Sequence, residues 1–114
     1  EKDGLLISEH LPNFPGSRIA LIQRNRITSG LSEALILCAS GIAGGAMVQS
    51  KIAHMQGIPI LIPSLDLGLQ PDDGLKFVKN EYNAKEMSCV EGIINYLEEE
   101  KKSDMSLQRN ISNF

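Results

Sequence analysis

A glycine-rich turn between two apolar segments carries the residues best suited to bind an anion. Its candidate phosphate-binding residues are Ser40, Gly41, Gly44 and Gly45. Glycines let backbone N–H groups approach a phosphate closely, and the start of a following helix favours negative charge. Ligands of open α/β sheets bind at this carboxyl end of a strand. The turn is neither GxGxxG nor a lysine-containing P-loop, so a turn that only packs helix on strand is the alternative.

A cluster of cationic and amide side chains upstream is the second candidate for phosphate binding. It consists of Arg18, Arg24, Asn25 and Arg26. In a helix each residue turns by about 100°, so Arg24 and Arg26 would point about 160° apart and could not hold one phosphate. Arg18 and Asn25 would share a face. We expect one arginine to pair with a carboxylate and another to face solvent or ligand; a wholly solvated or salt-bridged set is the alternative.

The sequence lacks the patterns that mark a catalytic or metal centre. His10 and His54 have no acidic or cysteine neighbours at ligand spacing, and neither a Ser-His-Asp order nor an HExxH motif is present. The two cysteines, Cys38 and Cys89, match no metal or redox spacing, and we expect both to be reduced and buried. We therefore expect no catalytic residue, no metal and no cofactor.

Composition and charge are those of one soluble domain. The 114 residues are 42% apolar and 22% charged, and no run approaches the roughly 18 apolar residues that a membrane helix needs. We expect a cytoplasmic protein without a signal peptide. The net charge is −3, yet between residues 10 and 57 four cations face only Glu33, which gives +3 there and −6 elsewhere. A local basic surface can hold a few phosphates despite the acidic total.

The elements that position these candidates alternate between strands and helices. We expect strands at 5–9, 34–39 and 58–63, because these runs are apolar and of strand length. Helices are expected from about 17–23 to 30, from 45 to 56, from 71 to 79 and around 90–97. In the second helix Val48, Ile52 and Met55 predict the buried face, and Gly57 stands where a C-cap belongs.

This order, β-α-β-α-β-α-α, predicts an α/β fold, a Rossmann-like parallel sheet flanked by helices. We expect it to span residues 1–102, with a polar, disordered tail at 103–114. Three strands make a thin sheet, so the chain is expected to be the C-terminal half of a larger Rossmann-like domain, unless another chain completes the core.

Several segments resemble the DNA-processing protein A (DprA/Smf) family over residues 4–86. Residues 24–32, Arg-Asn-Arg-Ile-Thr-Ser-Gly-Leu-Ser, closely resemble the family's RNRIISGLS helix. Residues 4–9 resemble a strand before its Pro-rich loop, 40–51 its SGSLITA segment, 57–64 its GRxVxAVPG strand and 74–78 its GxNxLI motif. Two departures from the family pattern bear on ligand specificity and not on the fold. The chain reads Cys38-Ala39-Ser40 where the family has a Glu-Ala pair, and Pro63-Ser64 where Pro-Gly is usual.

The resemblance implies a mediator of DNA recombination that acts without catalysis. Such proteins bind single-stranded DNA, pass it to a RecA-type recombinase during natural transformation and form homodimers through this half of the domain. Their single-strand site uses a basic residue upstream of the RNR block, which falls on Arg18 here. That site also uses a Gly-Ser-Arg loop from the family's first half. The triplet Gly16-Ser17-Arg18 has the same residues but follows a Pro-rich loop and not the first strand. Few aromatic residues are present, so platforms for base stacking are expected to be scarce.

Two other functions remain open at this point. The same turn could serve a sensor of one nucleotide or small ligand. The fold also resembles nucleoside-monophosphate phosphoribohydrolases, but those enzymes carry a Pro-Gly-Gly-x-Gly-Thr turn and a catalytic Glu on the next helix. No Glu or Asp occurs here between the turn and Gln56, which speaks against hydrolysis.

Overall fold

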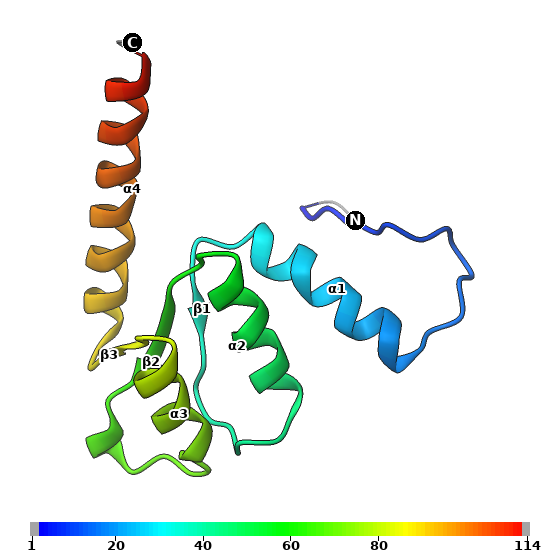
Figure 1. The fold of residues 1–114 in the computed structure, drawn as a ribbon, viewed down its shortest axis with the longest axis horizontal. Coiled ribbons are helices and arrows are strands. Elements are labelled where there is room, and N and C mark those ends of the chain that lie inside the picture. Colours follow the sequence, from blue (N-terminus) through cyan, green and yellow to red (C-terminus); the bar gives the residue numbers. More distant parts are fainter. Residues whose placement is uncertain (1–2, 113–114) are drawn as a thin grey trace.

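A computed structural model describes residues 3–112, and for residues 104–112 it describes the backbone alone. The protein is an α/β fold in which helices flank a three-stranded parallel sheet (Figure 1). The elements in chain order are α1 (Arg18–Gly30), β1 (Leu35–Ile36), α2 (Gly45–Met55), β2 (Ile60–Pro63), a 3-10 turn (Leu65–Leu67), α3 (Asp73–Glu81), β3 (Lys85–Met87) and α4 (Val90–Ser112). The expected Rossmann-like class is confirmed.

The core lies between the sheet and the helices that follow its strands. The strand order is β1-β2-β3, with Leu35 opposite Ile60 and Ile62 opposite Glu86. Ile60 and Ile62 on β2 are buried with Leu75 and Val78 of α3. Burial on both faces explains why β2 is a continuous apolar run, and its place between β1 and β3 makes it the central strand.

Helix α1 begins directly after a capping residue, near the first residue of the range expected for its start. The Ser17 side chain accepts a hydrogen bond from the Ala20 N–H at 3.0 Å, which satisfies one of the free donors of the first turn. The helix packs on α2, yet several of its apolar side chains stay exposed: Ile19, Leu21 and Ile22. The exposure of these residues explains why the sequence shows no clean hydrophobic stripe in this helix.

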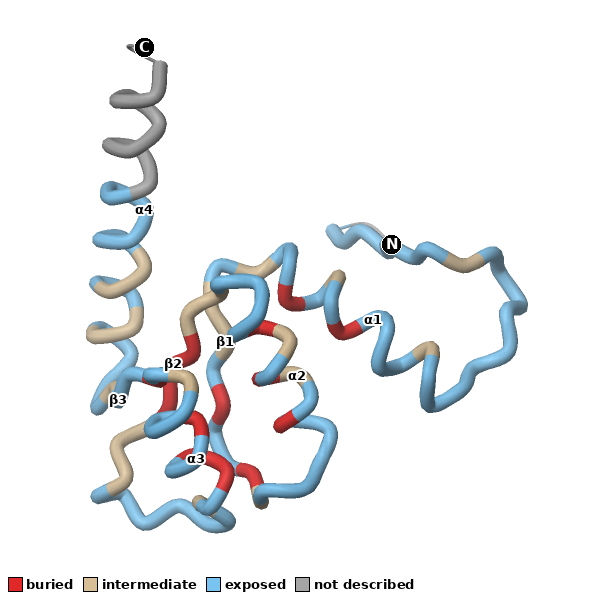
Figure 2. Tube along the Cα trace, in the orientation of Figure 1, coloured by how far each residue is buried: buried red, intermediate tan, exposed pale blue. Residues whose placement is uncertain are grey.

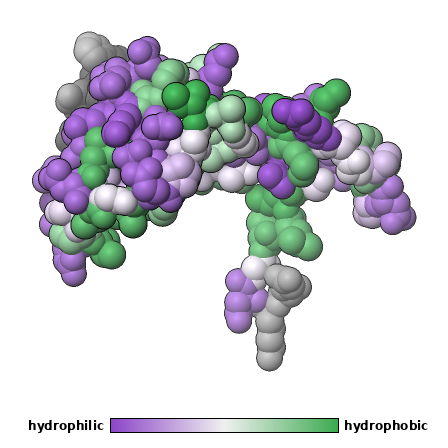
Figure 3. Space-filling view, turned by 90° about the horizontal axis from the view of Figure 1, so that it is seen from below, coloured by the Kyte–Doolittle hydropathy of each residue, from purple (hydrophilic) through white to green (hydrophobic). Residues whose placement is uncertain are grey.

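The expected strand at 5–9 is wrong. This segment is extended but pairs with no strand in the described part of the chain, and Leu5 and Leu6 are 83% and 87% exposed. Residues 3–16, which we call the N-terminal arm, lead away from α1 and are largely exposed (Figure 2). Figure 3 shows apolar side chains on this arm. An apolar run of strand length reports a preference for burial, but a strand also needs a neighbour to accept its hydrogen bonds.

Two expectations about burial are also wrong. Helix α2 buries Met47, Ser50 and Ala53, whereas Val48 and Met55 are exposed. The small Ser50 and Ala53 allow a close approach to neighbouring elements, so the inner face of α2 does not follow hydropathy alone. The cysteines are free but exposed. Cys38 follows β1, which is an edge strand and leaves one of its faces open.

The C-terminal part contains a strand that the sequence did not indicate. β3 is short and reads Lys-Glu-Met, so no apolar run marks it. Its other side contacts α4, where the Lys85 ammonium lies 4.8 Å from the centre of the Tyr96 ring. The backbone of α4 is helical to Ser112, through most of the segment predicted as a disordered tail; residues 113–114 lie outside the described residues. No helix between residues 3 and 112 combines the length and apolarity needed to cross a membrane.

Candidate functional site

A groove between α1 and the glycine-rich turn brings together four of the eight predicted site residues. It has a volume of about 390 Å³, and its polar lining consists of Arg18 and Asn25 from α1 and Gly44 and Gly45 from the turn. Leu21, Ile22 and Val48 add apolar walls. As helical spacing predicts, Arg18 and Asn25, seven residues apart, face the same way. We call this site the Arg18 groove.

The start of α2 supplies backbone donors to this groove. Gly44 is the N-cap and has no side chain that could satisfy the N–H groups of the first turn. The first bonds of the helix run from Met47 N and Val48 N to the Gly44 carbonyl, at 3.1 and 3.3 Å. The N–H groups of Gly45 and Ala46 precede these bonds, so they are available to an anion. A cation on one wall opposite free amides on the other is an arrangement suited to a phosphate.

The two walls are joined by hydrogen bonds across the α1–α2 contact. The Gln49 side-chain amide donates to the backbone carbonyl of Asn25 at 2.9 Å and also to the Ser29 hydroxyl. Asn25 and Ser29 are both buried. Hydrogen bonds require a particular orientation of donor and acceptor. The orientation of α1 on α2 therefore depends on these bonds as well as on close packing. Gln49 thus helps to hold α1, which carries Arg18, against α2, which begins at the turn.

Replacing Gln49 with alanine is expected to lower the free energy of unfolding by about 1–3 kcal/mol, because it leaves the buried Ser29 and the Asn25 carbonyl without their partner. Chemical denaturation measures this loss. Gln56→Ala is the matched control, since Gln56 is exposed and its amide donates one bond, 2.8 Å long, to the Arg26 carbonyl. Equal losses in the two variants would contradict the role assigned to Gln49.

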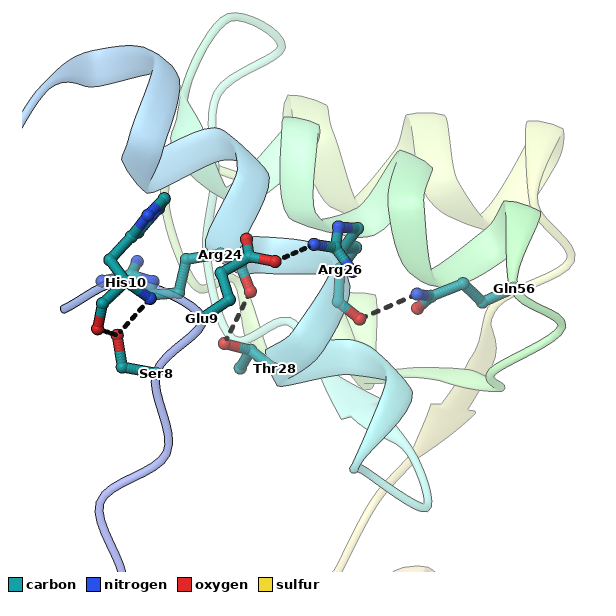
Figure 4. A network of polar contacts seen from close by, with 7 residues as sticks. All are labelled: Ser8, Glu9, His10, Arg24, Arg26, Thr28 and Gln56. Carbon is teal, nitrogen blue, oxygen red and sulfur yellow. Dashed lines mark hydrogen bonds and ion pairs between the residues drawn. The ribbon is translucent and has the colours of Figure 1, made fainter.

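Two predicted arginines lie outside the Arg18 groove. Arg24 lines a separate pocket, of about 450 Å³, between α1 and the N-terminal arm. Arg26 forms an ion pair with Glu9 of that arm (Figure 4). The close-up also shows the Thr28 hydroxyl donating to the Arg24 carbonyl at 3.4 Å, which involves only the backbone of that residue. Arg24 does reach one groove residue, because its guanidinium donates to the Asn25 side-chain oxygen at 3.5 Å. Neither Arg24 nor Arg26 lines the Arg18 groove itself.

Ser40 and Gly41 hold the turn against α3 instead of lining the groove. The Ser40 N–H donates to the Pro71 carbonyl at 2.9 Å, and the Ser40 carbonyl accepts from the Gly74 N–H at 2.8 Å. The Ser40 hydroxyl donates to the Gly41 carbonyl at 2.8 Å. Ser40 itself is buried. These two residues position Gly44 and Gly45 through the path of the backbone.

Sequence reasoning missed a second groove on the far side of Val48. It has a volume of about 310 Å³ and joins Lys51 of α2 to Phe77 of α3 and to Tyr82, the residue that follows α3. Gly44 and Val48 line both grooves. Residues 44, 48 and 51 lie on one helical face, so the spacing could have revealed Lys51. Phe77 carries no such signal, because only the packing of α3 beside α2 places it there.

Comparison with known proteins agrees with the resemblance drawn from the sequence motifs. Residues 1–98 match the family model described as DNA recombination-mediator protein A. Searches of curated proteins and of solved structures each returned no significant match. The matched range contains both walls of the Arg18 groove and all three strands. The chain therefore belongs to the DNA recombination-mediator protein A family.

Proposed function

We propose that this protein binds single-stranded DNA through the Arg18 groove and acts in recombination without catalysing a reaction itself. The observation that carries the proposal is the convergence of Arg18 and Asn25 with Gly44 and Gly45, from segments about twenty residues apart in the chain. A guanidinium and backbone N–H groups recognise phosphates in any sequence. The groove therefore suits a protein that must accept many DNA strands.

The charge around the groove supports this proposal. Neither α1 nor α2 contains an acidic residue, so the two helices present only cationic and neutral side chains to a DNA backbone. Binding that rests on phosphate neutralisation weakens with salt, because condensed counterions are released when the protein binds. We expect a strong salt dependence and little preference for base sequence.

Membership of the family supports partners beyond DNA. We infer that the protein passes the bound strand to a RecA-type recombinase during DNA uptake, that it works as a homodimer and that it does so in the cytoplasm. These inferences rest on the family resemblance. The exposed Ile19 of α1, which does not line the Arg18 groove, is compatible with a contact to a protein partner.

A sensor of one nucleotide is the second candidate. The observation that favours it is the size of the Arg18 groove, since about 390 Å³ falls within the range of small-ligand pockets. Hydrolysis of nucleoside monophosphates is less well supported, because α2 offers no carboxylate beside the turn. A carboxylate at that place is what the chemistry of those enzymes requires.

Fluorescence anisotropy separates these functions. A labelled single-stranded oligonucleotide is titrated with the 114-residue chain at two salt concentrations, with duplex DNA and a mononucleotide as competitors. We expect salt-sensitive binding that unlabelled single strands reverse and that duplex and mononucleotide do not. Displacement by stoichiometric mononucleotide would instead favour the sensor, and absence of binding at low salt would contradict the proposed function.

A further inference from the structure

The groove on the far side of Val48 combines an aromatic ring, a cation and an apolar floor. Its aromatic wall is Phe77 with Tyr82, its cation is Lys51, and Met47 and Ile42 complete the apolar lining. Since α2 and α3 lie side by side (Figure 1), these side chains open on the same surface. We call this site the Phe77 groove.

Three rings are fixed against one another at this place. Tyr82 stacks on His54 of α2, with ring centres 4.5 Å apart and planes inclined by 20°. Phe77 meets Tyr82 edge to face, at 5.5 Å and 88°. One face of Tyr82 is therefore occupied by His54, whereas Phe77 is 37% exposed and lines the groove. A ring held in this way can receive a flat ligand without first having to be ordered.

Charge identifies the ligand that such a ring would take. Of the residues that the structure describes, none lining the Phe77 groove or the Arg18 groove is acidic. Lys51 stands in the Phe77 groove and Arg18 in its neighbour, and the two grooves meet at Ala43, Gly44 and Val48. An aromatic face beside cations that follow a line is the pattern with which proteins hold single strands, one base stacked and its phosphate neutralised.

We propose that Phe77 is a stacking platform for one nucleobase of a single strand, with Lys51 holding the phosphate of that nucleotide and the strand continuing into the Arg18 groove. This inference rests on the proposed function and adds a base-binding subsite to it. It revises the expectation that stacking platforms are scarce, because one ring in the right place suffices for one base. Tyr82 and His54 act as positioning residues for that ring.

The test compares two probes of equal length, a single-stranded thymidine oligonucleotide and the same backbone with abasic sites throughout. Phe77→Leu is expected to weaken binding of the thymidine strand roughly five- to tenfold and to leave the abasic strand unchanged, because leucine fills space but cannot stack. Phe77→Trp is expected to restore binding of the thymidine strand. Phe14→Leu is the matched control, since Phe14 is an exposed ring outside both grooves.

Each alternative outcome separates the two proposals. If Phe77→Leu binds the thymidine strand as tightly as the wild type, the stacking role is overturned and the proposed function stands. Equal weakening for both probes, without rescue by tryptophan, would also overturn stacking, since it would show that Phe77 acts through the fold. If the wild-type protein binds neither probe, both the proposed function and this inference fail.

Discussion

Replacing Arg18 with glutamate is expected to weaken binding of single-stranded DNA on the order of tenfold or more at low salt. The slope of the logarithm of affinity against the logarithm of salt concentration is expected to fall by the amount that about one phosphate contact contributes. Reversal of charge removes a cationic partner of the phosphate and adds a carboxylate that repels any phosphate bound in the groove beside Gly44 and Gly45. Anisotropy titrations at several salt concentrations measure both quantities.

Loss of stability cannot account for that result. Arg18 is exposed and occupies the first position of α1, where the helix dipole disfavours a cation and favours a carboxylate. The substitution is therefore expected to leave the fold intact or to stabilise α1 slightly. Arg26→Glu is the control of equal charge change: its partner Glu9 lies on the N-terminal arm, away from the Arg18 groove. Should both variants lose affinity equally, net charge and not the groove would govern binding.

Replacing Gly74 with alanine is expected to cost about 2–3 kcal/mol in the free energy of unfolding. A Cβ at this position would lie 2.7 Å from the Ser40 carbonyl oxygen, 2.9 Å from the Met47 sulfur and 3.0 Å from the Gly41 carbonyl oxygen. The thioether can move aside, but the two carbonyls belong to the turn that carries Gly44. Relief of the clash must displace this turn, so affinity for single strands is expected to fall as well.

Gly92 provides the matched control for that prediction. It also stands in the first turn of a helix, α4, but an added Cβ would meet nothing nearer than the Cys89 sulfur at 3.7 Å. Gly92→Ala is expected to be neutral or to stabilise the protein by up to about 1 kcal/mol, because alanine has the higher helix propensity. Urea denaturation of both variants measures the two changes in the free energy of unfolding. A Gly74 variant as stable as the Gly92 variant would show that α3 does not hold the turn.

Local signals in the sequence were sufficient for much of the fold and for half of the candidate site. Helix α1 ends at Gly30 as expected, and Gly57, with a φ of 76°, closes α2 where a C-cap was expected. The seven-residue spacing of Arg18 and Asn25 placed them on one face. Each of these features depends on a few residues that are close together in the sequence, so it could be predicted from the sequence alone.

Features that depend on distant partners could not be predicted in this way. Segment 5–9 has the apolar run of a strand but pairs with no neighbouring strand in the described residues. In contrast, β3 has a polar sequence and is a strand because it pairs with β2. The Arg18 groove likewise depends on the packing of α1 against α2, to which Gln49 contributes bonds to buried polar groups distant in sequence. Arg24 and Arg26 differ from Arg18 in that both lie next to the N-terminal arm, whose position the sequence did not indicate.

The central claim is that phosphates of a single strand lie between Arg18 and the start of α2. A titration of the ¹⁵N-labelled protein with a short thymidine oligonucleotide, followed by amide chemical shifts, tests it most directly. We predict that the largest shifts occur at the amides of Gly44, Gly45 and Ala46, with smaller ones along the groove wall at Asn25. Shifts confined to α4 or the N-terminal arm, with the turn unchanged, would contradict the claim.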